Sequence, residues 1–125
     1  MIKLTMGEIL NAAPVLTKLT NQTFSGAATF KIARLLRALD KEINTFEETR
    51  TKMIQIYGEK DENGMLIEKE GQIRVMADKI ETFNNEINAL LKSEIEINGE
   101  KLSIEYFDNI ELTPVEANLI EVVVE

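Results

Sequence analysis

Cysteine, histidine and tryptophan are absent from this sequence of 125 residues, and proline occurs only twice. Without cysteine, the chain can form neither a disulfide bond nor a thiolate nucleophile. Without histidine, it lacks the side chain that most often acts as a general base near neutral pH, and also the commonest transition-metal ligand. These absences rule out a Ser-His-Asp triad and favour a protein that is not an enzyme.

The serine and glycine residues show no catalytic pattern either. Serine occurs only at Ser25, Ser93 and Ser103, and none of these lies in a nucleophile-elbow motif. No glycine-rich phosphate loop precedes a lysine. The sequence therefore predicts no catalytic residue, no cofactor and no metal ion.

Oxygen ligands gather in one predicted loop, at Asp61, Asn63, Glu68 and Glu70. A calcium ion could use such oxygens, but their spacing lacks the full order of an EF-hand loop. A solvated turn explains the same residues more simply, and we favour it over a calcium site.

Acidic side chains outnumber basic ones by 22 to 14, which gives a formal net charge of -8. This charge would repel nucleic-acid phosphates and anionic membrane surfaces, so we expect a protein partner. The start of the chain does not resemble a signal peptide, and no apolar run approaches the roughly 18 residues of a membrane span. The length fits one domain over residues 1–125.

Two stretches show the apolar period of about 3.5 residues that is typical of packed helices. In the first, from Gly26 to Tyr57, Arg50 fills the one core position that is not apolar. We predict that the two stretches form an antiparallel helical hairpin. The apolar positions are Ile32, Leu36, Leu39, Ile43, Phe46, Met53 and Tyr57 in the first stretch, and Met76, Ile80, Phe83, Ile87 and Leu90 or Leu91 in the second.

Two β-hairpins are predicted outside the long helices. A small one at the tip joins the apolar residues 65–67 to residues 72–75, although Ile73 also fits a backward extension of the second helix. The other spans residues 94–106 around Asn98-Gly99, a dipeptide that favours two-residue turns. Its expected buried face comprises Ile95, Ile97, Leu102, Ile104 and Tyr106.

Helix boundaries carry local signals. A short strand over residues 2–4 precedes Thr5, which forms a capping-box pattern with Glu8, and Pro14 should kink or split the helix that follows. Ser25 is the predicted N-cap of the long helix, and Gly58 should end this helix in a left-handed conformation. A second capping box, from Thr113 to Glu116, opens a last short helix through about residue 122. The predicted fold class is α+β, mainly α.

Three segments resemble an uncharacterised family of small proteins from tailed bacteriophages and prophages of Gram-positive bacteria. They are Lys3-Leu4-Thr5 with Glu8-Ile9, the run from Tyr57 to Gly64, and Ile110-Glu111-Leu112-Thr113-Pro114. The matching residues belong to turns and caps, so the resemblance implies no functional residues. It implies a phage context, with a location in the host cytoplasm or the virion.

Two candidate surfaces for a partner emerge from the pattern. Arg34, Arg37 and Lys41 recur at three and four residues on the side of the long helix opposite its apolar positions. An ordinary solvated helix face is one interpretation, and an acidic protein partner is the other. The predicted hairpin tip offers the second surface, with Met65, Leu66, Ile67 and Ile73.

Two functions fit these features. The first is a binding module that docks on a host or phage protein and modulates it, for example an inhibitor of a bacterial defence system. The alternative is a virion assembly component, such as a chaperone or connector subunit, that forms homo-oligomers through its helical hairpin. An enzyme ranks third.

Overall fold

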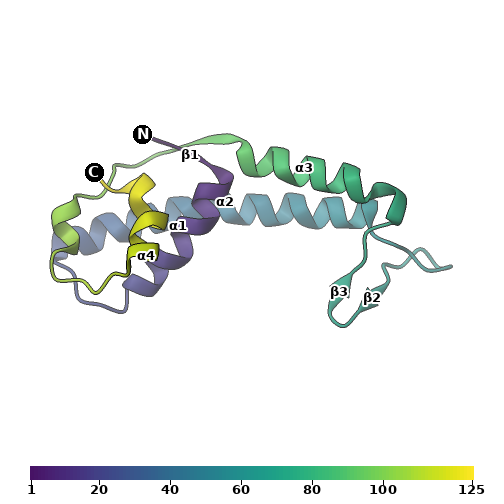
Figure 1. Ribbon diagram of the computed structural model, residues 1–125, viewed down its shortest axis with the longest axis horizontal. Coiled ribbons are helices and arrows are strands. Elements are labelled where there is room, and N and C mark those ends of the chain that lie inside the picture. The colour runs from purple at the N-terminus through teal and green to yellow at the C-terminus, as the bar shows by residue number, and fades with distance from the viewer. The chain divides into compact units, whose positions relative to one another are not determined.

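A computed structural model describes residues 1–125, which form mainly helices with two small antiparallel sheets (Figure 1). The chain divides into two compact units. We call Met1–Ile43 together with Lys92–Glu125 the terminal unit, and Asn44–Leu91 the middle unit. The long helix α2 (Gly26–Tyr57) contributes residues to both. No helix combines the length and the apolar character that are needed to cross a membrane.

The terminal unit contains most of the buried apolar side chains. Strand β1 (Ile2–Thr5) pairs antiparallel with β4 (Glu94–Ile97), so that Ile2 lies opposite Ile97. Helix α1 (Met6–Leu19) packs against α4 (Pro114–Ile120), and 3₁₀ helix η3 (Glu121–Val123) also contacts α1. The buried residues of α1 are Met6, Ile9, Ala12, Ala13, Val15, Leu16 and Leu19.

Local capping explains why these helices begin where they do. The Thr5 hydroxyl accepts the Glu8 N–H at 3.1 Å, and the Glu8 carboxylate accepts the Thr5 N–H at 2.8 Å. The Ser25 hydroxyl likewise accepts the Ala28 N–H at the start of α2. Both caps agree with the sequence prediction. Helix α1 continues through Pro14, however, so this residue does not split it.

The prediction of a β-hairpin over residues 94–106 is wrong. Strand β4 pairs with β1, while residues 104–107 form 3₁₀ helix η2 (Ile104–Phe107), which Ser103 caps. Neither Asn98 nor Gly99 has the positive φ that a two-residue hairpin turn requires. The following segment pairs with the end of the chain instead: the Leu102 N–H donates to the Val123 carbonyl at 2.7 Å beside a parallel bridge to Val124.

The middle unit buries far fewer apolar side chains than the terminal unit does. Helix α3 (Ile80–Lys92), which follows 3₁₀ helix η1 (Ala77–Lys79), has no buried residue. In this unit α3 runs beside the end of α2 (Figure 1), where the Tyr57 and Phe83 rings meet edge to face at 6.3 Å. The Tyr57 hydroxyl donates to the Glu86 carboxylate at 2.9 Å, and this hydrogen bond raises the pKa of Tyr57.

A two-residue turn joins β2 (Glu68–Lys69) to β3 (Gln72–Ile73) in the middle unit. Its central residues Glu70 and Gly71 both have positive φ, of 53° and 75°, as a type I′ turn requires. Ile73 belongs to β3, so the alternative of a backward extension of the second helix is wrong.

Two further expectations about α2 need correction. Arg50 occupies no core position: it is exposed and pairs with Glu47 of the same helix at 3.5 Å. Burial would strip water from the guanidinium charge, so the solvated position is the more stable one. Gly58 does not have a positive φ. Close packing accounts for this glycine instead, because a Cβ there would lie 2.6 Å from the Ile54 carbonyl oxygen and 2.8 Å from Leu66 Cδ2.

Candidate functional site

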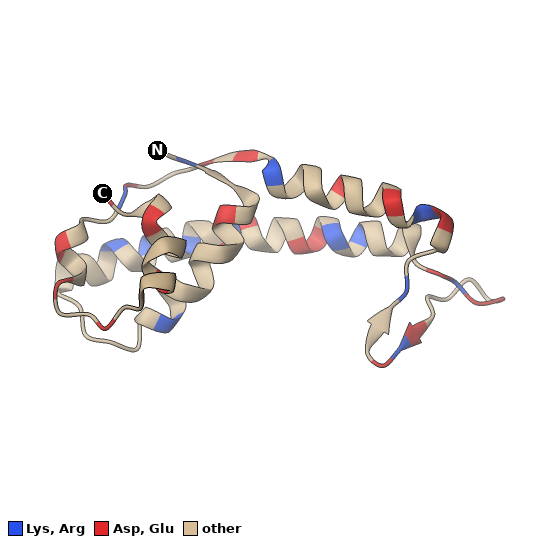
Figure 2. Cartoon of the chain, viewed as in Figure 1, with Lys and Arg blue, Asp and Glu red and all other residues tan.

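The basic stripe, which comprises Arg34, Arg37 and Lys41, lies exposed on α2 in the terminal unit, as the sequence predicts. Figure 2 shows basic groups along α2 in a chain that is acidic overall. Neither Arg34 nor Arg37 forms a salt bridge. Phe30 lies one helical turn before Arg34 on the same face, and 68% of it is exposed.

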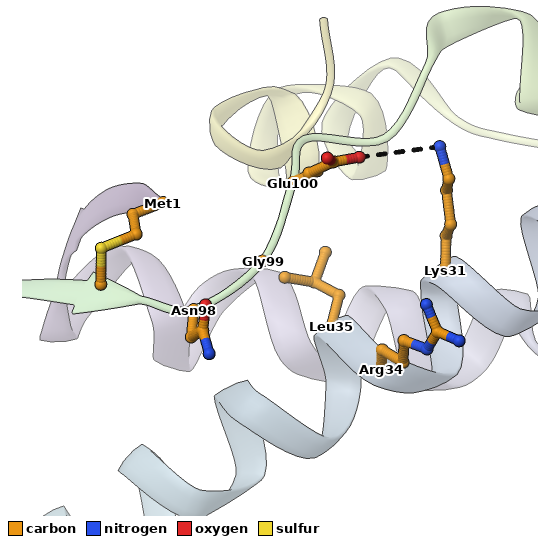
Figure 3. Close-up of a pocket in the computed structure, with 7 residues that line it drawn as sticks. All are labelled: Met1, Lys31, Arg34, Leu35, Asn98, Gly99 and Glu100. Atoms are coloured by element: carbon orange, nitrogen blue, oxygen red, sulfur yellow. Dashed lines mark ion pairs between the residues drawn. The ribbon is translucent and has the colours of Figure 1, made fainter.

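Arg34 lines a cavity of about 430 Å³ together with Lys31, Leu35, Asn98 and Glu100 (Figure 3). Lys31 Nζ lies 3.8 Å from Glu100 Oε2 and 5.9 Å from the centre of the Tyr106 ring. A hydrogen bond with the Tyr106 hydroxyl is the main cause that raises the pKa of Lys31. Lys31 is therefore occupied within the protein, whereas the guanidinium of Arg34 forms no salt bridge.

The second predicted surface divides into exposed and half-buried residues. Met65 is 66% exposed, but Leu66, Ile67 and Ile73 are half-buried. Leu66 and Ile73 pack close to Gly58. Only Met65 therefore presents most of its side chain to a partner. These four residues belong to the middle unit, whereas the basic stripe belongs to the terminal unit.

The acidic loop is explained by a turn. Asp61 Oδ1 accepts the N–H groups of Asn63 at 2.9 Å and Met65 at 3.0 Å, which is the pattern of an Asx-turn. No three acidic side chains lie close enough together to hold a metal ion. The loop residues Glu68 and Glu70 are exposed.

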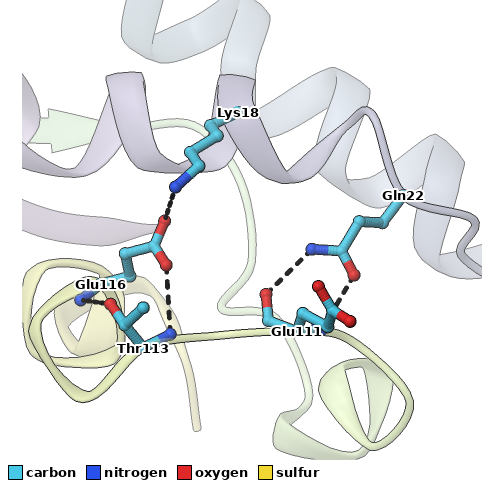
Figure 4. A network of polar contacts seen from close by, with 5 residues as sticks. All are labelled: Lys18, Gln22, Glu111, Thr113 and Glu116. Carbon is cyan, nitrogen blue, oxygen red and sulfur yellow. Dashed lines mark hydrogen bonds and ion pairs between the residues drawn. The ribbon is translucent and has the colours of Figure 1, made fainter.

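A polar network joins α1 and the loop after it to the start of α4 (Figure 4). Glu116 accepts the Thr113 N–H at 3.1 Å and pairs with Lys18 at 3.0 Å. The Thr113 backbone, and then Lys18, lower the pKa of Glu116. Gln22 bonds the Glu111 backbone twice, at 2.9 Å and 2.8 Å. These groups satisfy one another, so the network has a structural role.

Sequence reasoning missed an apolar groove near the end of the chain. We call it the C-terminal groove: a cavity of about 570 Å³ between η2, α4 and residues 121–125. Ile104 lines it and is 65% exposed, although the sequence predicts that this residue is buried in a hairpin. The sequence does not predict this groove, because no local sequence pattern indicates that the segments forming its walls contact one another.

A family described as "Protein of unknown function (DUF1617)" matches residues 8–122 of this chain. The chain belongs to the DUF1617 family. The family is uncharacterised, in agreement with the resemblance to an uncharacterised family described above. Membership therefore gives no functional role for any residue. No curated protein and no solved structure is detectably similar to this DUF1617 protein.

Proposed function

We propose that this DUF1617 protein is a non-enzymatic binding module of a phage, which docks on a host or phage protein and modulates it. Inhibition of a bacterial defence system is one such activity. The protein would act in the host cytoplasm or in the virion. One observation carries the proposal: two exposed arginines without salt-bridge partners, Arg34 and Arg37, lie one turn apart on a long helix of an acidic chain.

The chemistry of this face suits an acidic protein partner. Arginine is enriched among the residues that dominate binding energies, because its planar guanidinium can bond a carboxylate through two N–H groups. Helix geometry places the Cα atoms of Arg34 and Arg37 about 4.5 Å apart along the axis. A nucleic-acid partner fits less well, since the net charge of -8 would repel its phosphates.

The test is a quantitative capture from phage-infected cells, with mass spectrometry as the readout. The bait variant combines Arg34→Glu, Arg37→Glu and Lys41→Glu. The matched control combines Lys52→Glu, Lys60→Glu and Lys69→Glu, which changes the net charge equally at exposed residues of the middle unit. We expect the first variant to lose a partner that the wild type and the control retain, with the larger loss at low salt.

Equal capture by both variants would refute the basic stripe as the binding face. A substitution at an Asp or Glu that abolished activity and left the fold and the partner affinity intact would overturn the binding-only proposal, because only a catalytic group separates these properties.

A second candidate is a virion assembly component that oligomerises through an antiparallel hairpin of α2 and α3. It is favoured by apolar residues of the middle unit that are only partly covered: α3 has no fully buried residue, and Ile80 is 46% exposed. If this face holds copies together, Ile80→Asp should lower the molar mass measured by light scattering, whereas Met65→Asp in the same unit should not.

A further inference from the structure

The C-terminal groove is a formed apolar site. Phe107 and Ile120 are buried among its lining residues, and Ile104 is exposed beside them. Backbone hydrogen bonds fix one wall, because the Glu125 N–H donates to the Leu102 carbonyl at 2.9 Å and the Ile104 N–H donates to the Glu125 carbonyl at 2.9 Å. The volume of about 570 Å³ lies within the range of pockets that enclose a bulky apolar group.

The rim of the groove is acidic. Glu121 and Glu125 line it, both are exposed, and neither forms a salt bridge with a lysine or arginine. Apolar walls beside such carboxylates select an occupant with an apolar side chain and neighbouring cations. An acidic peptide would bring like charges to this rim and is disfavoured.

The terminal unit itself carries a segment with this chemistry. Phe30 is 68% exposed and lies four residues before Arg34 and seven before Arg37, on one face of α2. The two arginines therefore follow the aromatic residue at about 6 Å and about 10 Å along the helix axis. None of these three residues lines the C-terminal groove of its own molecule.

We propose that the C-terminal groove binds a second copy of this protein: Phe30 of one molecule inserts between Ile104 and Ile120 of the next, and Arg34 and Arg37 face Glu121 and Glu125. In the proposed contact each molecule inserts Phe30 into one neighbour and receives Phe30 from another, so the contact is heterologous and propagates into a ring or a filament. The contact uses the arginines that the proposed function assigns to an acidic partner. Self-assembly and partner binding therefore exclude each other on the same face.

The first experiment measures molar mass against concentration by sedimentation and light scattering. We expect the wild type to grow beyond a dimer, and Phe30→Asp or Ile104→Asp alone to remain monomeric. An equimolar mixture of these two variants should stop at a dimer, because it contains one working aromatic side chain and one working groove. Ile56→Asp is the control, since it also removes an exposed apolar side chain and lies in the middle unit.

A charge exchange tests the acidic rim. The pair Arg34→Glu with Arg37→Glu and the pair Glu121→Lys with Glu125→Lys should each weaken self-association by at least about tenfold. Mixing the two double variants should restore assembly, since each then meets the opposite charge. Circular dichroism should show unchanged helix content in every variant, because all the substituted residues are exposed.

A wild type that stays monomeric up to about 1 mM would overturn this inference. Assembly that survives Phe30→Asp would also overturn it, including the case in which Ile80→Asp abolishes that assembly. Ile104→Asp separates the inference from the proposed function, because this residue lies outside the basic stripe. That variant should lose self-association and still capture the partner. Loss of the partner in Ile104→Asp would show that the groove receives a foreign protein instead of a second copy.

Discussion

The terminal unit contains most of the buried apolar side chains, whereas the middle unit buries only Phe46 and Met53 among its apolar side chains. Segments distant in sequence build the first core: β1 pairs with β4, and α1 packs against α4. The structure of the middle unit depends more on local turns, such as the Asp61 turn and the Glu70-Gly71 turn. Few buried apolar groups and solvent-exposed hydrogen bonds are marks of low local stability. We therefore expect the middle unit to open before the terminal unit.

Leu39→Ala in the terminal unit should have the largest effect. Leu39 is 0% exposed, so its truncation leaves a cavity and should cost about 2–5 kcal/mol of unfolding free energy. Ile80→Ala in the middle unit should cost less than about 1.5 kcal/mol, because this side chain is 46% exposed. Urea denaturation followed by circular dichroism measures both. Equal losses would contradict the difference between the two units.

Gly58→Ala should selectively loosen the middle unit. The added Cβ would lie 2.6 Å from the Ile54 carbonyl oxygen, which cannot move without distorting α2, so we expect a loss of about 1–3 kcal/mol. Amide hydrogen exchange should accelerate across residues 44–91 and change little in the terminal unit.

Gly26→Ala is the matched control for this change, since a Cβ added at the start of α2 would meet no neighbouring atom within 4 Å. That substitution should leave hydrogen exchange in the middle unit as it is. If Gly58→Ala behaved in the same way, the close packing around Gly58 would be refuted.

Thr113→Ala should destabilise the terminal unit by about 1 kcal/mol. It removes the hydroxyl that accepts the Glu116 N–H at 3.1 Å and so leaves an unsatisfied donor at the start of α4. Thr23→Ala is the control, because Thr23 is exposed and the cap of the next helix is Ser25. Thermal unfolding of both variants provides the measurement, and similar melting temperatures would argue against this cap.

Acid should remove a smaller contribution to stability, which comes from the Glu116 carboxylate at the start of α4. The folded state lowers the pKa of Glu116 below its ordinary value of 4.5, so its stabilising effect is present above that value and is lost as the pH falls through the lowered pKa. Glu116→Gln should therefore be less stable than the wild type at pH 7, and the difference should shrink in strong acid. Glu62→Gln, at an exposed loop residue, is the control variant with the same change of side chain. A constant difference at all pH values would contradict the linkage.

The sequence predicted those parts of the fold whose cause is local. Both capping boxes form as expected, since a threonine and a glutamate three residues later meet within one helical turn. The exposed position of Arg34 and Arg37 follows from helical periodicity in the same way. The C-terminal groove could not be predicted, because Ile104 and Val124 come together only when the last residues pair with Leu102.

The partner of β4 shows where this limit lies. The alternation of Glu94 to Ile97 by itself determined a strand, because side chains that alternate suit one buried and one solvated face. Whether that strand pairs with its neighbour in sequence or with β1 depends on which apolar face covers Ile97. Ile2 and Leu4 supply that face from the other end of the chain. Packing in three dimensions therefore decides the pairing partner of β4, because the free energy gained by burying apolar area does not depend on sequence distance.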